Sequence, residues 1–375
     1  MLFKEKEIKP LHLKMENMCE KGDTLWFTSF YFNALYKMKK IDVRTTFVCS
    51  FPEEKASLRM YSKIVAHGDV FYCIPYSADS IGVYDAERAE CKSLKIDMPT
   101  MSGGVNYRPD AKFFDAYCDD KYLYMFPHTY PAVVRLNLAN HEIDYFYHTL
   151  TEMEKDIVND NFYFSKICDF GDKKIMFCNA SKKIYFFDSS KMMFQEWFSM
   201  KQEEGAITLA VAGQYAWLFS NYNREIRKIN LVDKEVKTIR DLPKELSYGS
   251  FPVTRTAIYN GFVYFVPGTA NKPIKVNMDT DDVSIATEIL PEEFMPEANR
   301  EVWKFSLLEV LGNQLFAYDD VARQLIKYDA PNNKVTKDYI LSDVNSRSGK
   351  NVIREQLLLD GKITDLKSYL EYMKR

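Results

Sequence analysis

Two stretches of the sequence, "AHGDVFYCIPYSADSIGVYD" (66–85) and "IYNGFVYFVPGTANKPIKVN" (258–277), follow the same pattern. Each has a Gly-containing turn, an apolar run that ends in Pro, a short polar loop, a second apolar run and a final Asp or Asn. The two stretches lie 192 residues apart, which is four times 48. A period of this length indicates a repeat architecture, in which each unit buries its apolar face against the next.

The second apolar run and its terminal residue recur along the chain. The runs "VVRLN", "IYFFD", "EIRKIN" and "LIKYD" repeat it, and "LYKMK" is an early, degenerate copy. The seven copies end at Lys39, Asp85, Asn137, Asp188, Asn230, Asn277 and Asp329. Their spacings of 46, 52, 51, 42, 47 and 52 residues predict seven units of about 48 residues within 1–349.

The first apolar run of each unit indicates strands. Runs such as "VFYCIP" and "FVYFVP" are six residues long and rich in aromatic and β-branched residues, which is typical of strands. A turn signal precedes each run, and the final Asp or Asn can start the next turn through its side chain. Each unit therefore predicts four short antiparallel strands, A to D. Strand B is expected to begin near Leu25, Val70, Tyr122, Lys174, Ala216, Phe262 and Gln314.

Over about residues 12–345 this pattern resembles that of seven-bladed β-propeller repeat proteins. The resemblance implies an all-β propeller of four-stranded antiparallel blades. The Gly-Gly of kelch blades and the Trp-Asp of WD blades do not recur, so no subfamily is indicated and no functional residue is carried over. A ring of six or eight blades and a two-sheet β-sandwich remain as alternatives.

The last segment, 350–375, departs from the repeat. Its apolar residues Ile363, Leu366, Leu370 and Met373 are spaced three, four and three apart, which predicts a short amphipathic helix. This helical tail is expected either to dock on its own propeller or to mediate an oligomer, because the same spacing also forms coiled-coil seams.

Composition excludes several classes of function. A net charge of −3 argues against nucleic-acid binding, and no apolar run has the length of a membrane span. The seven cysteines are scattered without a CxxC pair, which indicates reduced thiols, no metal or other cofactor, and a cytoplasmic protein. Cys73 and Cys178 lie within apolar runs and are expected to be buried and unpaired.

The long connectors between strand D and the next strand A carry four arginines, and long loops on a rigid scaffold are where function concentrates. These arginines are Arg59, Arg108, Arg255 and Arg300. One hypothesis is that they converge on the central channel and hold an anionic or polar ligand. The alternative is that they pair with carboxylates of the same loops, namely Glu53, Glu54, Asp110, Glu292 and Glu297.

Aromatic residues and His128 extend the candidate surface, and Tyr, Trp and Arg are enriched in protein interfaces. The full candidate binding set is Arg59, Tyr107, Arg108, His128, Tyr130, Tyr222, Arg255, Arg300 and Trp303. We predict a non-enzymatic binding or scaffold propeller whose D–A and B–C loops recognise a protein, a peptide or a polar or anionic ligand. The alternative is a carbohydrate-active enzyme, a glycosidase or polysaccharide lyase, at the channel mouth. Its candidate carboxylates are Asp79, Asp110, Glu293 and Asp320.

Overall fold

The computed structural model describes residues 13–54, 57–99, 107–150, 164, 166–200, 206, 208–250, 252–290 and 304–341. The predicted C-terminal helix and the candidate residues Arg300 and Trp303 lie outside this part of the chain. The chain divides into two compact units. Unit 1 contains residues 1–95 and 338–375, and unit 2 contains residues 96–337.

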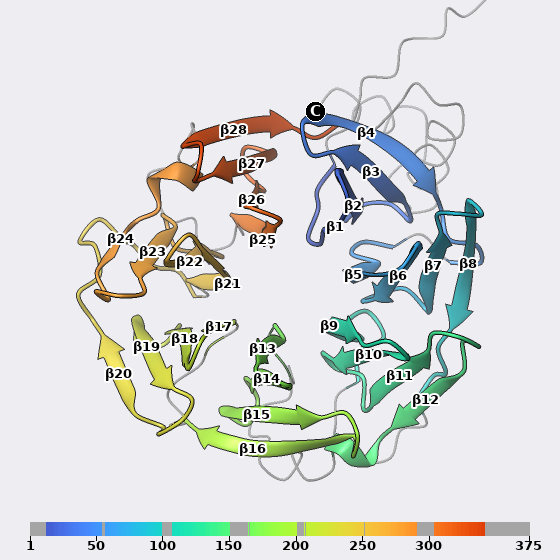
Figure 1. Ribbon diagram of the computed structural model, residues 1–375, viewed down its shortest axis with the longest axis horizontal. Helices are drawn as coiled ribbons and strands as arrows, with labels where there is room; N and C mark the ends of the chain where they lie inside the picture. The colour runs from blue at the N-terminus through green and yellow to red at the C-terminus, as the bar shows by residue number, and fades with distance from the viewer. Residues whose placement is uncertain are drawn as a thin grey trace, which may run out of the picture. The chain divides into compact units, whose positions relative to one another are not determined.

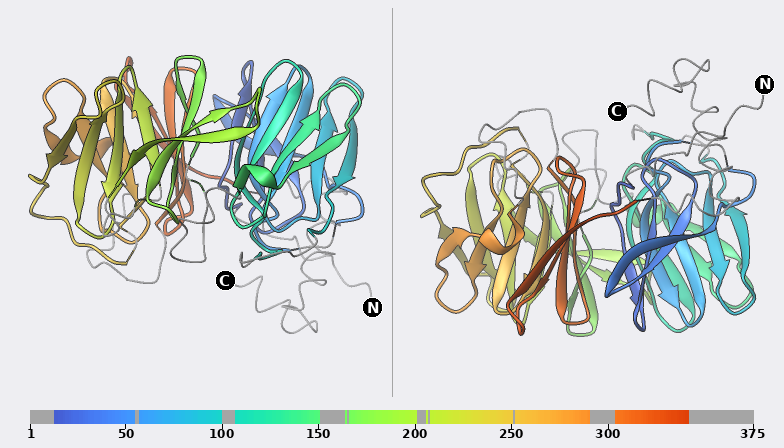
Figure 2. Two further views of the ribbon diagram at one scale, coloured as in Figure 1. Left: turned by 90° about the horizontal axis from the view of Figure 1, so that it is seen from below. Right: turned by 90° about the horizontal axis from the view of Figure 1, so that it is seen from above.

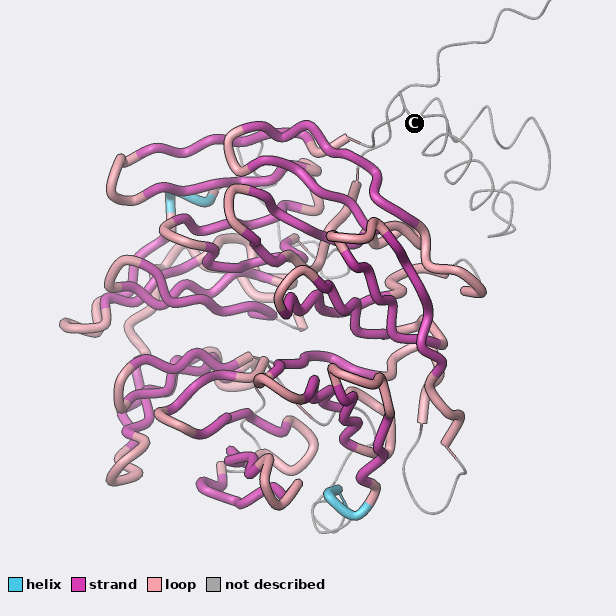
Figure 3. The backbone as a smooth tube through the Cα atoms, turned by 45° about the vertical axis from the view of Figure 1, so that its right-hand side comes forward, coloured by secondary structure: helices cyan, strands magenta, loops and turns pink. Residues whose placement is uncertain are grey.

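The described strands form seven four-stranded sheets, in each of which strands consecutive in sequence are hydrogen-bonded neighbours (Figure 1). The protein is therefore an all-β, seven-bladed β-propeller, as predicted. Figure 3 shows that the described residues form mostly strands and very little helix.

The blades follow the chain in order. Blade 1 contains β1 (Cys19–Lys21), β2 (Thr24–Thr28), β3 (Leu35–Lys39) and β4 (Asp42–Cys49). Blade 2 contains β5 (Tyr61–His67), β6 (Val70–Pro75), β7 (Ser80–Asp85) and β8 (Glu90–Lys95). Blade 3 contains β9 (Phe113–Cys118), β10 (Tyr122–Pro127), β11 (Val133–Asn137) and β12 (Ile143–Phe146). Blade 4 contains β13 (Cys168–Phe170), β14 (Lys173–Cys178), β15 (Lys183–Asp188) and β16 (Met193–Ser199).

Blade 5 contains β17 (Leu209–Ala212), β18 (Tyr215–Ser220), β19 (Glu225–Asn230) and β20 (Val236–Ile239). Blade 6 contains β21 (Val253–Tyr259), β22 (Phe262–Pro267), β23 (Ile274–Asn277) and β24 (Val283–Ile285), followed by the 3-10 turn η1 (Thr287–Ile289). Blade 7 contains β25 (Phe305–Leu311), β26 (Gln314–Asp319), β27 (Gln324–Asp329) and β28 (Lys334–Tyr339). Within unit 2 the first strand of each blade is the innermost (Figure 1), and the strands run between two loop-bearing ends (Figure 2).

The predicted register is confirmed. All seven third strands end at the predicted residues, and each second strand begins within one residue of its predicted start. The predicted side-chain turns also form in the six blades that have Asp or Asn there. Asp85 Oδ1 accepts from the Glu87 N–H at 3.0 Å, and Asn137 Oδ1 accepts from the Ala139 N–H at 2.9 Å. The polar residue thus both ends the third strand and reverses the chain.

The turn between the first and second strands requires backbone angles that favour glycine. Asn260 and Gly261 both have positive φ, 49° and 78°, as in the two-residue turns that match the twist of a hairpin. A Cβ added to Gly261 would meet nothing within 4 Å. The conformation, and not a lack of space, therefore selects glycine here.

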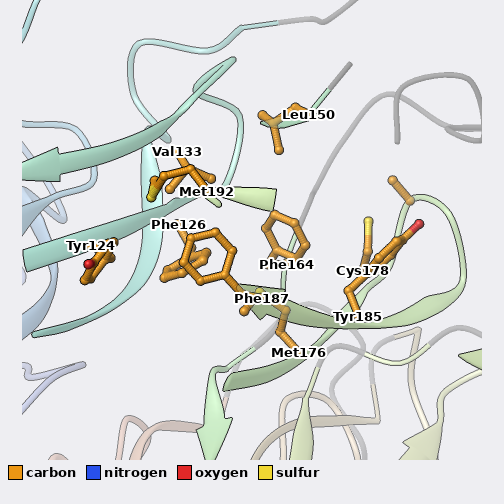
Figure 4. Close-up of a cluster of buried hydrophobic side chains, with 11 residues drawn as sticks. Tyr124, Phe126, Val133, Leu150, Phe164, Met176, Cys178, Tyr185, Phe187 and Met192 are labelled. Carbon is orange, nitrogen blue, oxygen red and sulfur yellow. The ribbon is translucent and has the colours of Figure 1, made fainter. Parts of the chain in front are cut away.

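Within each unit, neighbouring blades pack on one another through the side chains of their middle strands. Between blades 3 and 4, Phe126 and Phe187 meet edge to face at 4.9 Å, and both are buried (Figure 4). Cys178 lies in the same cluster and Cys73 in its counterpart between blades 1 and 2, and both are fully buried. All seven cysteines are free thiols, so the expectation of buried, unpaired Cys73 and Cys178 is confirmed.

Hydrogen bonds within unit 1 tie the last described residues to the first. The Leu13 N–H donates to the Ile340 carbonyl at 2.9 Å, and Thr45 Oγ1 donates to the Leu341 carbonyl. The segment after β28 is thereby fixed to the chain before β1 and to the outer strand β4.

An ion-pair network joins the outer parts of blades 5 and 6. Asp281, in the turn between β23 and β24, accepts from Lys228 Nζ at 2.7 Å and from Lys237 Nζ at 2.6 Å. The side chains of Asp281 and Lys228 are only 11% and 12% exposed. Burial alone would raise the pKa of Asp281, but the hydrogen bonds and charges of the two lysines outweigh it and hold that pKa below its usual value.

Replacing Asp281 by asparagine should therefore lower the free energy of unfolding by about 1 kcal/mol at neutral pH. A carboxyl whose folded-state pKa is depressed stabilises the protein above its unfolded-state pKa, and this stability is lost as the pH falls through the folded value. The deficit of Asp281→Asn should therefore shrink below about pH 4. Urea unfolding at about pH 7 and pH 3 measures the loss of unfolding free energy caused by Asp281→Asn. The control is Asp279→Asn, a change at an exposed residue of the same turn. An equal deficit at both pH values would contradict this role.

Candidate functional site

The loops of blade 3 that carry four of the predicted site residues are braced by hydrogen bonds. The His128 N–H donates to the Lys112 carbonyl at 2.8 Å, and Thr129 Oγ1 donates to the Ala111 carbonyl at 2.7 Å. The Arg108 N–H in turn donates to Thr129 Oγ1 at 3.1 Å. The D–A connector and the B–C loop therefore form one fixed corner at the start of β9.

The bond between these two loops recurs in other blades. In each case the residue after the second strand donates its N–H to the residue before the first strand. The further pairs are Tyr76 with Met60, Gly268 with Pro252, and Asp320 with Lys304. His128 and Asp320 thus occupy equivalent corner positions in blades 3 and 7.

The first strands of four blades are bulged at their second residue. In β9, Phe113 and Asp115 pair with consecutive residues of β10, and Phe114 between them has no partner there. The equivalent residue of each of the other three strands is also left out of the pairing. These residues are Ser62 in β5, Thr254 in β21 and Ser306 in β25. A bulge leaves one residue out of the ladder and changes the direction of the side chains around it, which is why bulges are frequent beside functional sites.

The bulges of unit 2 bring together residues from three blades. The guanidinium carbon of Arg255 (blade 6) lies 5.4 Å from the ring centroid of Phe114 (blade 3). Arg255 Nε donates to the Ser306 carbonyl (blade 7) at 3.3 Å. The Phe114 ring stacks on His128 at 5.4 Å, and Ser306 Oγ donates to Asp320 Oδ1 at 2.8 Å. We call these five residues the inner cluster.

A second contact between non-adjacent blades of unit 2 is a charge pair. Lys166 Nζ, just before β13, lies 3.1 Å from Glu309 Oε2 in β25. The next residue, Ile167, donates its N–H to the carboxylate of Asp115 in β9 at 2.9 Å. Polar contacts thus link the segment just before β13 of blade 4 to the first strands of blades 3 and 7.

Two buried charged residues flank the inner cluster on blade 7. Lys304 and Asp319 are 5% and 1% exposed. Burial lowers the pKa of Lys304, against the attraction of Asp319. Burial also raises the pKa of Asp319, although hydrogen bonds from the Val321 and Ala322 N–H groups and the charge of Lys304 oppose this. Both shifts favour the neutral form, and such opposed shifts are frequent in functional sites.

The three described arginines have different partners. Arg108 makes a two-pronged ion pair with Asp110 of its own loop, at 2.9 and 3.2 Å, and this arginine lowers the pKa of that carboxyl. Arg59, in unit 1, pairs with Glu16 and lies 3.9 Å above the Tyr76 ring. Arg108 therefore pairs with a carboxylate of its own loop, as the alternative hypothesis predicted. Arg255 instead contacts the innermost strands of other blades.

The predicted tyrosines occupy different environments. Tyr130 is fully buried, packs on Phe113 at 4.9 Å and donates its hydroxyl to the Asp97 carbonyl at 2.8 Å. Tyr107 meets the Tyr130 ring edge-on at 5.7 Å. Tyr222 is 70% exposed in the B–C loop of blade 5. Of the predicted set, His128 and Arg255 belong to the inner cluster, Tyr107, Arg108 and Tyr130 form the adjacent blade 3 corner, and Tyr222 stands apart.

Sequence reasoning missed Phe114 and Ser306. Phe114 stands beside Phe113 in a run that reads as uniformly apolar, and Ser306 is an ordinary strand residue. Both residues lie at β-bulges, which arise from pairing with the second strand and leave no mark in the local sequence. In the described segments no group of three or more His, Cys, Asp or Glu side chains is arranged to hold a metal ion. The same segments contain no helix with the length and apolarity of a membrane span.

Comparisons with known proteins agree with the fold. No protein-family model and no curated protein sequence matches the chain. Virginiamycin B lyase from Staphylococcus aureus is similar in structure, with a TM-score of 0.60 at 12% identity, over 83% of this chain and 95% of that one. A streptogramin B lyase structure has a TM-score of 0.54 at 13% identity, over 78% and 88%.

The surface protein PorZ of Porphyromonas gingivalis has a TM-score of 0.53 at 9% identity, over 88% of this chain and 38% of that one. Identities this low carry information about the fold and not about activity. These likenesses and the seven sheets assign the chain to the seven-bladed β-propeller fold and indicate no subfamily.

Proposed function

We propose that the protein is a binding propeller that recognises an anionic group at the inner cluster of unit 2. The group would be a carboxylate or phosphate carried by a small molecule or a peptide. The observation that carries the proposal is the position of Arg255. A bulged strand of blade 6 directs its guanidinium over Phe114 of blade 3, and the Ser306 carbonyl fixes its Nε.

The surroundings suit such a ligand. Guanidinium forks match the geometry of carboxylate and phosphate oxygens, and fixed aromatic rings offer a stacking surface. Phe114 and His128 are already stacked at 5.4 Å with an interplanar angle of 22°. A ligand with a planar or sugar ring beside its anionic group would contact both the guanidinium and the ring pair.

The partner is proposed to be a small polar or anionic ligand or an acidic peptide, in keeping with a binding or scaffold role. The enzyme alternative now centres on blade 7. Asp319, with its raised pKa, lies beside Lys304, whose pKa is lowered. Asp110 does not suit the acid role of a glycosidase, because Arg108 holds its pKa low. Cleavage of a uronate-containing polysaccharide would favour the enzyme.

A thermal-shift screen tests the proposal. The probes are inorganic phosphate, glucuronate, glucose 6-phosphate and a short glutamate peptide. At least one should raise the melting temperature of the wild type, because a ligand at 100 times its Kd stabilises by about 2.7 kcal/mol. Arg255→Ala should weaken binding about tenfold to hundredfold, since a hydrogen bond to a charged group contributes about 1.5–3 kcal/mol.

The matched control is Arg88→Ala, which removes an exposed arginine from the turn between β7 and β8. It should leave binding unchanged. Arg255→Lys keeps the charge without the fork and should bind between wild type and Arg255→Ala. If no probe shifts the wild type, or if Arg255→Ala binds like Arg88→Ala, the proposed function is wrong.

A further inference from the structure

Four of the seven cysteines lie in one apolar cluster of unit 1. Cys73 in β6 is fully buried, and Cys19, Cys49 and Cys91 pack against the same cluster as partly buried residues. They come from four strands of blades 1 and 2. The cluster therefore brings four thiol groups close together, and two of them are placed so that they can react with each other.

Two of these thiols are held next to each other. Cys49 is the last residue of β4, the outer strand of blade 1, and Cys91 lies in β8, the outer strand of blade 2. Cys91 Sγ donates to the carbonyl of Ser50, the residue after Cys49, at 3.4 Å. Two residues on, Ser93 Oγ donates to the Pro52 carbonyl. These bonds align β8 with segment 50–52 and fix the position of Cys91 relative to Cys49.

Cys91 also affects the pKa of the Cys49 thiol. Burial raises the pKa of Cys49, and the charge of Cys91 and a hydrogen bond between the two thiols raise it further. A raised pKa keeps Cys49 protonated at neutral pH, so this thiol reacts slowly. The hydrogen bond from Cys91 Sγ to the carbonyl of Ser50, the residue next to Cys49, provides the proximity that a disulfide requires.

We propose that Cys49 and Cys91 form an oxidation site that closes to a disulfide between blades 1 and 2 when a small peroxide reaches it. The thiolate of Cys91 attacks hydrogen peroxide, gains one oxygen to become a sulfenic acid, and releases hydroxide. Cys49 sulfur then attacks the sulfenic sulfur, the S–O bond breaks, and the oxygen leaves as water. In total, two thiols and one peroxide give one disulfide and two waters.

The disulfide would cross-link the outer strands of two consecutive blades, which are otherwise joined here by side-chain hydrogen bonds. Such a link removes conformational freedom from the unfolded chain. The oxidised protein should therefore melt a few degrees higher than the reduced protein and resist proteolysis between the blades. In a reducing cytoplasm, which the sequence predicts, the pair would be reduced at rest and oxidised transiently.

The test is peroxide treatment of the reduced, full-length protein, followed by alkylation and peptide mass mapping without reductant. The wild type should lose two free thiols and yield one linked peptide pair containing Cys49 and Cys91. Dithiothreitol should restore both thiols. Cys49→Ser should leave Cys91 at sulfenic or higher oxidation states without a linked peptide. Cys118→Ser, a change in unit 2, should behave like the wild type.

Melting curves recorded for each variant before treatment establish that it is folded. The proposal is overturned if folded wild type keeps both thiols under peroxide, or if the linked peptides contain Cys19 or Cys73 instead. It is also overturned if Cys91 reaches sulfinic acid at the same rate in wild type and in Cys49→Ser. These outcomes concern unit 1 only and do not depend on ligand binding at the inner cluster.

Discussion

Replacing Phe126 by alanine is expected to cost about 3–5 kcal/mol of unfolding free energy, as large deletions in well-packed cores do. Phe126 is completely buried between blades 3 and 4. Its ring meets Phe187 at 4.9 Å and Phe164 at 6.3 Å (Figure 4), and it meets Phe194 at 6.1 Å. Phe187 and Phe194 belong to β15 and β16 of blade 4, and Phe164 is bridged to Cys178 of β14. Loss of the Phe126 ring therefore removes the blade 3 side of all these contacts.

Urea unfolding followed by tryptophan fluorescence and by circular dichroism measures the effect. Phe126→Leu keeps most of the volume and should cost markedly less. Tyr222→Ala removes an exposed ring and should change stability by less than about 0.5 kcal/mol. A loss for Phe126→Ala no greater than that for Tyr222→Ala would show that blades 3 and 4 do not pack through this cluster.

Adding one methyl group at Gly82 is expected to cost about 1–3 kcal/mol. Gly82 lies in β7, and a Cβ built there would come within 2.8 Å of three atoms of the Phe51 ring. Phe51 is itself only 2% exposed and packs edge-on against Tyr61 at 5.2 Å. The ring has no room to retreat, so Gly82→Ala should force either the strand or the ring to shift.

A double-mutant cycle separates this clash from a general loss of strand stability. Phe51→Leu in the Gly82→Ala background should recover part of the loss, giving a coupling of about 0.5–3 kcal/mol between adjacent residues. Tyr222→Ala, which removes an exposed ring from unit 2, should show no such coupling with Gly82→Ala. Additive effects of Gly82→Ala and Phe51→Leu in urea titrations would refute the proposed contact.

The strand boundaries were predictable because local chemistry sets them. In most blades the Asp or Asn that ends the third strand accepts a hydrogen bond from the backbone two residues on, as at Asp188 and Asn230. Such turns need no information from elsewhere in the chain. Between the turns, successive side chains of each apolar run point to opposite faces of the sheet, so both faces can pack against neighbouring blades. The seven-fold count followed from repeating this local pattern.

The candidate site was harder to predict because it depends on non-local geometry. The conformation of its loop decides whether Arg108 binds a ligand or pairs with Asp110. In the structure Arg108 pairs with Asp110. Tyr130 looked like a loop residue, yet its hydroxyl finds the Asp97 carbonyl and its ring lies buried. Phe114 joins Arg255 only because β9 and β21 are both bulged. Sequence spacing carries none of these facts.

A crystal structure of the protein with glucuronate or glucose 6-phosphate tests the central claim most directly. The account predicts the carboxylate or phosphate oxygens within hydrogen-bonding distance of the Arg255 guanidinium, about 2.7–2.9 Å. The sugar ring should lie against Phe114 or His128. A probe that binds in solution but occupies another surface, with no density at the inner cluster, would contradict the account.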